Sequence, residues 1–304
     1  MAAERTILVT GASGNVGRQV VSQLMTGHIG EVRALTRDPR AATLPGGVDV
    51  RQGDLADPAA LEAALKGADA VFLMWPFHGA DPAPAVVDAI KWHVGRVVFL
   101  SSGAVQDGVA PERQAHPVGR SHACVEQLIE GSGLVWTHLR PSTFAVNTLW
   151  WADQIRAGDV VRGAYGALPM ALLHEADIAA VAVRALTEDG HGRTAYALTG
   201  PEVLTQAEQV RTIGEVLGRP LRWQELSREE ARQRLLADGS FPDSFVDPLL
   251  DGYATMLDAP PRPSPGPSRR SRAHRPAPTA PGWPTTPPTS ADPAAHLTSR
   301  RGGR

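Results

Sequence analysis

The stretch Gly11-Ala12-Ser13-Gly14-Asn15-Val16-Gly17 follows an apolar run, 7–10, and opens a segment whose apolar residues have helical spacing. A strand, a glycine turn and a helix in that order form a phosphate-binding loop. Glycines let the backbone approach a pyrophosphate, and the helix N-terminus offers free N–H groups. Glycines at this spacing also recur in loops that bind nothing. The place of this stretch, after a predicted strand, favours dinucleotide binding.

Beyond this stretch, short apolar runs alternate with helical patterns. The runs that we predict as strands are 32–36, 48–51, 70–74, 97–102 and 134–139, and the helical patterns cover 58–66, 84–92 and 118–129. Short continuous apolar runs suit strands that are covered on both faces. Their alternation with helices indicates right-handed βαβ units and a doubly wound parallel sheet. We therefore expect an α/β fold of Rossmann type.

The expected sheet gathers several segments at one edge, because ligands of such sheets bind at the carboxyl ends of the strands. The residues that we expect to contact the cofactor there are Gly11, Ser13, Gly14, Asn15, Val16, Gly17, Arg37, Asp54, Leu55, Met74, Trp75, Pro76 and Ser101.

The end of the second predicted strand bears on which nicotinamide cofactor binds. An acid there would bond the ribose 2′-hydroxyl of NAD, whereas a basic residue favours the 2′-phosphate of NADP. The chain has Arg37, whose guanidinium matches phosphate geometry. We therefore expect NADP(H), and NAD(H) stays an alternative because Asp38 could pair with Arg37. Arg37 could also be a solvated loop residue.

Composition limits the remaining classes of protein. The chain has 304 residues, a formal net charge of −2 and a single cysteine, Cys124, so it has no disulfide framework. We find neither a signal peptide nor an apolar run of the roughly 18 residues that a membrane span needs. These features predict a cytoplasmic protein.

Residues 260–304 differ in composition from the rest of the chain. They hold 12 of the 26 prolines and eight arginines, with Asp292 as their one acid. Such a segment cannot bury enough apolar surface to offset its ordering entropy, so we expect a disordered tail. The arginines could instead contact an anionic partner, although binding of nucleic acid is not favoured because Trp283 is the only aromatic residue there. An out-of-frame reading of the gene is a third explanation.

Five segments together carry a resemblance to a known family. They are Gly11–Gly17, Thr36-Arg37-Asp38, Gly53-Asp54-Leu55, Leu100-Ser101-Ser102-Gly103 and Trp136–Pro141. Over roughly residues 5–240 the chain resembles the atypical short-chain dehydrogenases/reductases, and among them the NmrA-like NAD(P)H-binding group. The resemblance implies a Rossmann core, here 1–142, and a smaller substrate lobe, here 143–259, with elements that return to the core. It also implies that Asp54 contacts adenine, although Asp54 could instead cap the next helix, a role for which Asp57 is better placed.

The same resemblance raises a question about catalysis. Familiar members use a tyrosine as general acid, a lysine four residues later and a serine after the fifth strand. Here Val118 and His122 occupy the first two places, so the usual carbonyl reduction is in doubt. Ser102 and His122 remain as candidate catalytic residues, the latter because its unperturbed pKa lies near neutrality. His122 could otherwise face the ribose or solvent.

Aromatic residues and histidines lie where the substrate is expected. Candidates for the substrate pocket are Phe77, His116, Phe144, Trp150 and His174, with ordinary core packing as the alternative. We expect a helix over 178–186 with Asp177 as its N-cap. No spacing of ligand residues resembles a metal site.

These observations favour an NADPH-dependent oxidoreductase that reduces a small apolar quinone, enone or carbonyl without the Tyr-Lys pair. A non-catalytic NADP(H)-binding redox sensor is the alternative, and an isomerase or epimerase is a weaker one. We expect a small-molecule substrate, neither metal nor membrane, and a monomer or homodimer.

Overall fold

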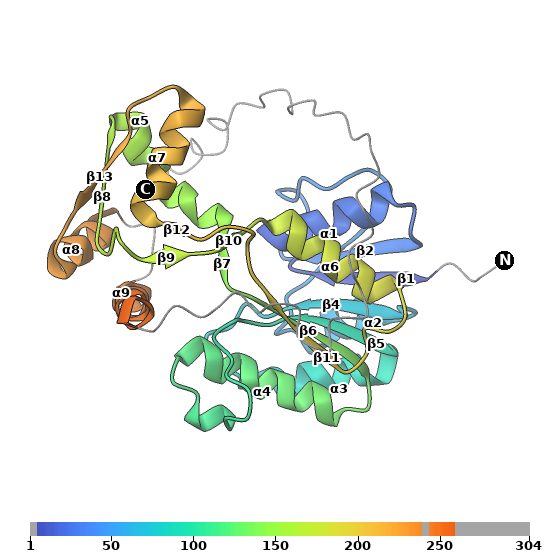
Figure 1. Ribbon diagram of the computed structural model, residues 1–304. Helices are drawn as coiled ribbons and strands as arrows, with labels where there is room; N and C mark the ends of the chain where they lie inside the picture. Colours follow the sequence, from blue (N-terminus) through green and yellow to red (C-terminus); the bar gives the residue numbers. More distant parts are fainter. Residues whose placement is uncertain (1–4, 239–242, 259–304) are drawn as a thin grey trace, which may run out of the picture. The chain divides into compact units, whose positions relative to one another are not determined.

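The computed structural model describes residues 5–238 and 243–258, and its centre is a seven-stranded parallel sheet. The strand order is β11-β6-β5-β4-β1-β2-β3 (Figure 1). The strands are β1 (Thr6–Thr10), β2 (Glu31–Thr36), β3 (Asp49–Gln52), β4 (Ala70–Met74), β5 (Arg96–Leu100), β6 (Val135–Pro141) and β11 (Thr194–Leu198). This doubly wound sheet confirms the predicted Rossmann-type fold.

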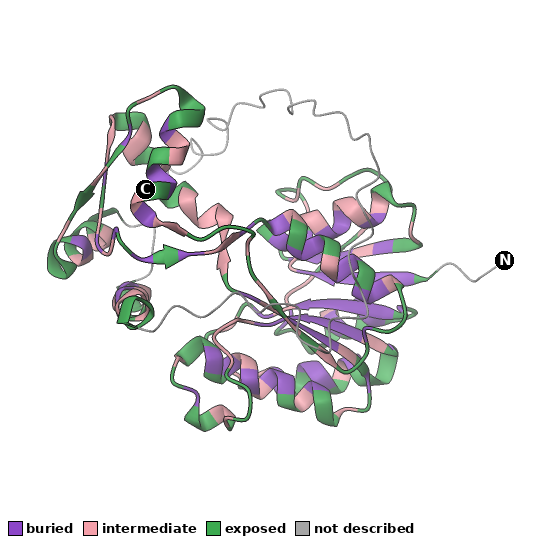
Figure 2. Cartoon of the chain, viewed as in Figure 1, coloured by how far each residue is buried: buried purple, intermediate pink, exposed green. Residues whose placement is uncertain are grey.

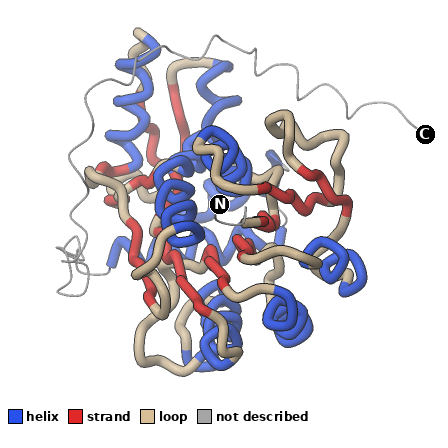
Figure 3. Tube along the Cα trace, turned by 90° about the vertical axis from the view of Figure 1, so that its right-hand side faces the viewer, coloured by secondary structure: helices blue, strands red, loops and turns tan. Residues whose placement is uncertain are grey.

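Helices cover both faces of the sheet (Figure 1). On one face lie α1 (Asn15–Thr26) and α6 (Glu175–Thr187), and on the other lie α2 (Pro58–Leu65), α3 (Ala83–His93) and α4 (Pro117–Gly131). Their alternation with the strands can be followed in Figure 3. The central strands β1, β4 and β5 are buried while the edge strand β3 and the outer helix faces are largely exposed (Figure 2), which explains why the central strands read as continuous apolar runs and the helices as periodic ones.

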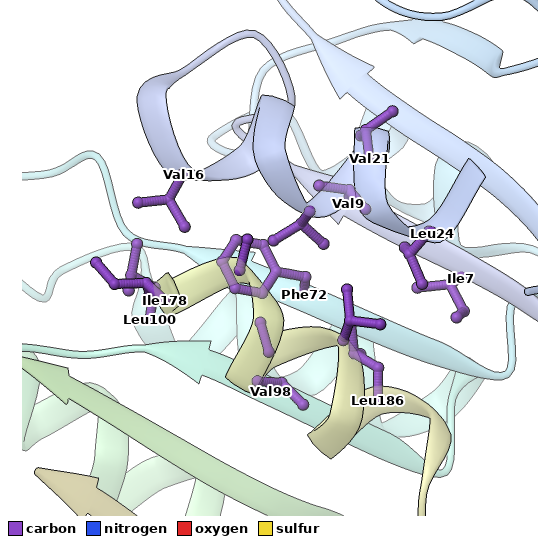
Figure 4. Close-up of a cluster of buried hydrophobic side chains, with 14 of the residues drawn as sticks. Ile7, Val9, Val16, Val21, Leu24, Phe72, Val98, Leu100, Ile178 and Leu186 are labelled. Atoms are coloured by element: carbon purple, nitrogen blue, oxygen red, sulfur yellow. The ribbon is translucent and has the colours of Figure 1, made fainter. Parts of the chain in front are cut away.

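The face with α1 and α6 holds the core that supports the glycine stretch. Figure 4 shows Val16, Val21 and Leu24 of α1 packed with side chains of β1, β4, β5 and α6. Leu24 is fully buried, so its truncation to alanine would cost about 2–5 kcal/mol of stability. The start of α1 is therefore fixed by packing on its own sheet.

Register aligns the carboxyl ends of the central strands. Thr10 of β1 pairs with Leu35 of β2, and Leu100 of β5 lies between Met74 of β4 and Leu139 of β6. The residues that follow these strands therefore meet at one edge of the sheet, as expected.

A second group of elements follows β6. Its strands form three two-stranded sheets, β7–β10, β9–β12 and β8–β13. The strands are β7 (Thr143–Phe144), β8 (Val160–Gly163), β9 (Pro169–Met170), β10 (Leu172–Leu173), β12 (Leu204–Thr205) and β13 (Arg222–Glu225). The helices of this group are α5 (Ala152–Ala157), α7 (Gln206–Leu217), α8 (Arg228–Asp238) and α9 (Asp243–Asp258), with the 3-10 helix η2 (Ala145–Trp151), whereas the 3-10 helix η1 (Pro111–Arg113) lies earlier, between β5 and α4. The return of α6 and β11 to the large sheet separates 143–173 from 199–258.

Local sequence signals fix several helix ends. Asp57 accepts hydrogen bonds from the N–H groups of Ala59 and Ala60 at the start of α2, which confirms its role as N-cap. Thr205 and Glu208 form a capping box at the start of α7, and Gly218, with φ of 65°, ends that helix.

The expected start of α6 was wrong. The helix begins at Glu175, and its N-cap is His174 rather than Asp177. Nδ1 of His174 accepts from the N–H of Ala176 at 3.0 Å. The imidazole of His174 therefore caps the helix, a role that we predicted for the carboxylate of Asp177.

Two sequence predictions concern membranes and the tail. Within the described ranges, we find no helix with the length and apolar character needed to cross a membrane. The predicted disordered tail, 260–304, lies outside the described residues.

Candidate functional site

The glycine stretch forms a close turn in which side chains would not fit. Gly11 has φ of 60°, a conformation that favours glycine, and its carbonyl accepts from the N–H of Gly14 at 2.9 Å. A Cβ on Gly17 would overlap the Gly11 carbonyl oxygen, and a Cβ on Gly14 would lie 3.2 Å from that oxygen. These contacts require a bare backbone here, as a pyrophosphate cradle does.

The helix that follows is open at its N-terminus. Its N-cap is Gly14, and no side chain of the described residues bonds to this end of the helix. The first-turn N–H groups of a helix lack intrahelical partners and carry partial positive charge. Ser13, Gly14 and Asn15 are exposed, so an anion can reach this end. The residues present fit the phosphates of a dinucleotide.

The end of β2 presents a free guanidinium beside the cradle. The hydroxyls of Ser13 and Thr36 lie 3.3 Å apart, which places the loop after β2 next to the glycine turn. Arg37 is exposed and pairs with no carboxylate of the described residues. Asp38 instead accepts from the N–H groups of Arg40 and Ala41, at 3.0 and 3.2 Å. The pairing that would have neutralised Arg37 is thus replaced by a local turn.

The loops after β3 and β4 hold further predicted residues. Asp54 accepts from the N–H of Ala56 at 2.9 Å, and Leu55 is buried. The side chain of Met74 lies against Gly11, close enough to overlap any Cβ there. Met74 therefore lies beside the glycine turn, and Leu55 packs in the core on the side of α2 and α3.

Trp75 is more deeply placed than we expected. It is buried, its indole N–H donates to the carbonyl of Gly79 at 2.9 Å, and Phe77 meets it edge to face at 4.9 Å between ring centroids. Its polar atom is therefore committed to its own loop, while the adjoining Pro76 is exposed. Trp75 and Phe77 stabilise the loop after β4.

The two serines after β5 have different surroundings. Ser101 is buried, and its hydroxyl donates to Oε1 of Glu126 on α4 at 2.5 Å, while its contact with the cofactor stays a prediction. Ser102 is half-buried, and its Oγ accepts from the N–H of Ala104 at 3.2 Å. An Oγ that accepts one bond still has its proton to donate.

Glu126 is the centre of a buried clamp that sequence reasoning missed. Its carboxylate also accepts from Nε and Nη2 of Arg140 on β6, at 2.9 and 2.5 Å. Arg140 reaches Asp107 as well, at 2.6 Å. These carboxylates raise the pKa of Arg140, chiefly through the hydrogen bonds to Glu126. The clamp ties α4, β5 and β6 together at the carboxyl edge of the sheet.

A group of three potential ligand side chains lies beside this clamp. Atoms of Glu126, Glu130 and His138 lie within 4.8 Å of one another. The Glu126 oxygens already accept three hydrogen bonds, two of them from a cation. This arrangement suits an ion pair better than a metal ion.

The first turns of α4 hold the residues at the places of the familiar tyrosine and lysine. Val118 is exposed, and His122 stacks on Phe99 with 5.8 Å between ring centroids. Nδ1 of His122 lies 2.9 Å from the Val118 carbonyl, which assigns the proton to Nδ1. Burial lowers the pKa of His122, so the neutral ring predominates at pH 7.

The predicted pocket residues do not form one cluster. Nδ1 of His116 accepts from the N–H of Val118 at 3.2 Å as the N-cap of α4, and His174 caps α6. Phe144 packs against the core beneath α1 and α6. Trp150 is 39% exposed and lines a cavity elsewhere.

That cavity, of about 210 Å³, lies among η2, β8, β13, α8 and α9. Its aromatic lining is Trp150, Trp151, Trp223 and Tyr253. Trp151 and Trp223 meet edge to face, with 5.7 Å between centroids. The sequence held a signal for part of it in the pair Trp150-Trp151, whereas Trp223 and Tyr253 are too distant in sequence for any local pattern to bring there.

Comparison with known protein families identifies the family of this chain. The chain matches the model of the NAD(P)H-binding family over residues 11–189, and it belongs to this family. The resemblance to the NmrA-like atypical short-chain dehydrogenases/reductases is confirmed.

Characterised relatives with similar sequences are reductases by name. The chain is 44% identical over 247 residues to a (4-alkanoyl-5-oxo-2,5-dihydrofuran-3-yl)methyl phosphate reductase of Streptomyces griseus, covering 80% of this chain and 84% of that protein. It is 34% identical over 252 residues to an NAD(P)H azoreductase of Xenophilus azovorans, covering 82% and 86%.

Solved structures show the same fold. The NADPH-dependent quinone oxidoreductase of Escherichia coli, complexed with NADPH, matches with a TM-score of 0.69 and 28% identity over 83% of this chain and 89% of that one. A triphenylmethane reductase of Citrobacter matches with a TM-score of 0.68 and 22% identity over 83% and 90%, which shows likeness of fold alone.

Proposed function

We propose that this protein is an NADPH-dependent reductase of a small apolar substrate with a conjugated quinone, enone or carbonyl group. The observation that carries the proposal is the open cradle of Gly11–Gly17 beside the free guanidinium of Arg37. The names of the relatives, a reductase of a conjugated furanone, an azoreductase and a quinone oxidoreductase, support it.

In this proposal, different residues bind different parts of the cofactor and the substrate. Gly11, Ser13, Gly14, Asn15, Val16 and Gly17 hold the pyrophosphate, Arg37 binds the 2′-phosphate, and Asp54, Leu55, Met74 and Pro76 border the rest of the cofactor. Bound NADPH supplies the hydride. Residues 1–142 with α6 and β11 make the cofactor domain, and the remainder of 143–259 contributes to substrate binding.

Ser102 positions the acceptor. Because its Oγ accepts from the backbone of Ala104, its proton is free to bond a substrate oxygen and polarise the conjugated system. His122 is a poor acid, since its Nδ1 proton is held by Val118 and its pKa is lowered by burial. The proton that completes reduction therefore comes from solvent, and the protein acts mainly through orientation.

One observation favours the alternative, a non-catalytic sensor of NADP(H). The exposed Val118 cannot transfer a proton from the place where family members carry a tyrosine. NADPH oxidation with a panel of quinones and enones distinguishes the two. Turnover that needs both NADPH and an acceptor supports the reductase. Micromolar binding of NADPH with no turnover across the panel would support the sensor.

A further inference from the structure

We propose that the cavity of the second lobe binds the phosphate group of a phosphomonoester substrate through Arg162 and Arg234. This inference rests on the proposed reductase function and deepens it, because it names the part of the substrate that does not react.

The lining of the cavity carries two positive charges that are unpaired in the described part of the chain. Arg162 on β8 and Arg234 on α8 both line the cavity, and neither pairs with a carboxylate among the described residues. Other arginines of this lobe do pair, namely Arg156 with Asp153, Arg211 with Glu215, Arg219 with Asp159, Arg228 with Asp247 and Asp251, and Arg232 with Asp247. Arg222 on β13 is also unpaired among the described residues, but it does not line the cavity, so Arg162 and Arg234 are the two guanidiniums that the cavity can offer to a ligand.

The acids of the lining do not cancel them. Asp153 is held by Arg156, and Asp238 is not free either. A phosphomonoester carries close to two negative charges at pH 7 and three acceptor oxygens. Two guanidiniums, each with a planar fork of donors, match the charge and geometry of a phosphomonoester better than those of a ligand with a single carboxylate.

The cavity also has an apolar, aromatic part to its lining. Trp151 and Trp223 form an edge-to-face pair, and the ring of Trp223 lies so close to Gly163 and Gly166 that a Cβ at either glycine would overlap it. Glu225 fixes that ring by accepting from its indole N–H at 2.7 Å. Rigid aromatic surfaces beside paired cations suit an amphiphilic ligand with an apolar body and an anionic end.

Shared elements link the cavity to the cofactor crevice. Thr143 of β7 and Leu172 of β10 line the cavity, while their chain neighbours Phe144 and Leu173 pack in the core that contains Val16 of α1. Helix α9 lines the cavity with Leu250 and Tyr253. The position that a Cβ would take on Gly252 lies 3.6 Å from Nε2 of His116, the N-cap of α4.

Strands β7 and β10 and helix α9 thus line the cavity and also contact the domain that we propose for the cofactor. A substrate held by its phosphate among Arg162 and Arg234 can extend its conjugated group toward Ser102. The Streptomyces griseus relative, a reductase of a furanone methyl phosphate by name, is consistent with such a ligand.

The test compares a phosphate ester with its alcohol. The probes are (4-alkanoyl-5-oxo-2,5-dihydrofuran-3-yl)methyl phosphate, the corresponding free alcohol, and the analogue with a carboxylate in place of phosphate. The proteins are the full-length chain, Arg162→Met, Arg234→Met and, as matched control, Arg222→Met. Arg222 is an exposed arginine of β13 that does not line the cavity. Calorimetry measures binding in the presence of NADP⁺, and NADPH oxidation measures turnover.

We expect each cavity variant to weaken binding of the ester by roughly tenfold or more. Affinity for the alcohol, affinity for NADPH and the circular dichroism spectrum should stay unchanged, and Arg222→Met should behave as the unaltered chain. Equal affinities for ester and alcohol in the unaltered chain would overturn the inference, even if both are reduced and the proposed function stands. A preference for the carboxylate analogue would overturn the assignment to phosphate. Arginine-dependent binding of the ester without turnover would support this site while rejecting the proposed reductase.

Discussion

The glycine stretch has little room for side chains, so single substitutions there are expected to impair cofactor binding. Gly14→Val adds a branched side chain to a position where even a Cβ lies 3.2 Å from the Gly11 carbonyl, at the open end of α1. We expect NADPH affinity to fall at least tenfold, equivalent to about 1.4 kcal/mol.

Fluorescence titration with NADPH measures this change. Gly46→Val is the matched control, because a Cβ at Gly46 meets nothing within 4 Å. Unchanged affinity in a folded Gly14→Val protein would place the cofactor elsewhere.

Arg37 is expected to select between the two nicotinamide cofactors. Arg37→Ala should weaken NADPH binding by roughly 1.5–3 kcal/mol and leave NADH binding nearly unchanged, because only NADPH presents a 2′-phosphate. Paired titrations with both cofactors measure this difference. Arg51→Ala is a control from the neighbouring strand β3, since Arg51 is already paired with Asp49. Equal losses for both cofactors would leave Arg37 as a surface residue.

Ser102 and His122 are expected to differ in their effect on turnover. Ser102→Ala removes the free hydroxyl proton and should lower kcat by roughly ten- to a hundredfold, with NADPH affinity retained. His122→Ala should cost less, because the neutral ring holds its proton toward Val118. A loss of about 10²–10⁴ in kcat for His122→Ala would instead identify it as the general acid. Steady-state kinetics with a quinone acceptor separate these outcomes.

Residues show where sequence reasoning succeeds and where it stops. The glycine turn, Arg37 and Asp57 were predicted because their roles depend on neighbours within a few positions. Whether the glycine turn and Arg37 bind a cofactor stays a prediction. The hydrogen bond of the Ser101 hydroxyl was not predicted, because its partner Glu126 lies 25 positions away. The cavity of Trp223 and Tyr253 depends on contacts between distant elements, which no local pattern records.

At the scale of elements, the same distinction separates the sheet from the second lobe. The central strands β1, β4 and β5 are continuous apolar runs because helices cover both faces of the sheet. The paired strands after β6 are short, such as the two residues of β7, and the partners of β8 and β9 come from segments beyond α6. Periodicity over two residues carries no signal, so these strands could not be predicted individually.

The contact between β6 and α4 makes stability depend on pH. His138 of β6 is fully buried and stacks on Trp136, and neither ring nitrogen makes a well-formed hydrogen bond in the described part of the chain, although Nε2 lies 3.3 Å from Oε1 of Glu130 on α4. Burial lowers the pKa of His138 from 6.5 to about 4, even though Glu126 raises it. Between these values the unfolded chain binds a proton that the native protein does not. Stability therefore falls as the pH drops from about 6.5 toward 4, by up to roughly 3 kcal/mol.

We expect His138→Leu to flatten this dependence, because leucine has a similar volume and takes no proton. Urea unfolding at pH 5 and pH 8 measures the difference in unfolding free energy between the two conditions. His93→Leu, at an exposed position of α3, is the control and should keep the slope. A slope in His138→Leu equal to that of the unaltered chain would assign the pH dependence to other groups.

At the scale of the whole molecule, charge and composition divide the chain near residue 260. Residues 1–259 carry a formal charge of −9 and residues 260–304 carry +7, so the small net charge of −2 conceals two segments of opposite sign. The four clusters of buried hydrophobic residues in the described part of the chain are built from positions before this division.

Truncation after Asp258 should therefore leave the melting temperature and NADPH affinity nearly unchanged. At low salt the basic segment can still be attracted to the acidic body, but such attraction between exposed charges is screened beyond about 10 Å at 0.1 M ionic strength. Any difference between the full and truncated chains should accordingly shrink as salt is added. Thermal unfolding and NADPH titration of both chains at low and high salt measure this. A large loss in either quantity that persists at high salt would mean that 259–304 makes apolar contacts with the body, contrary to its composition.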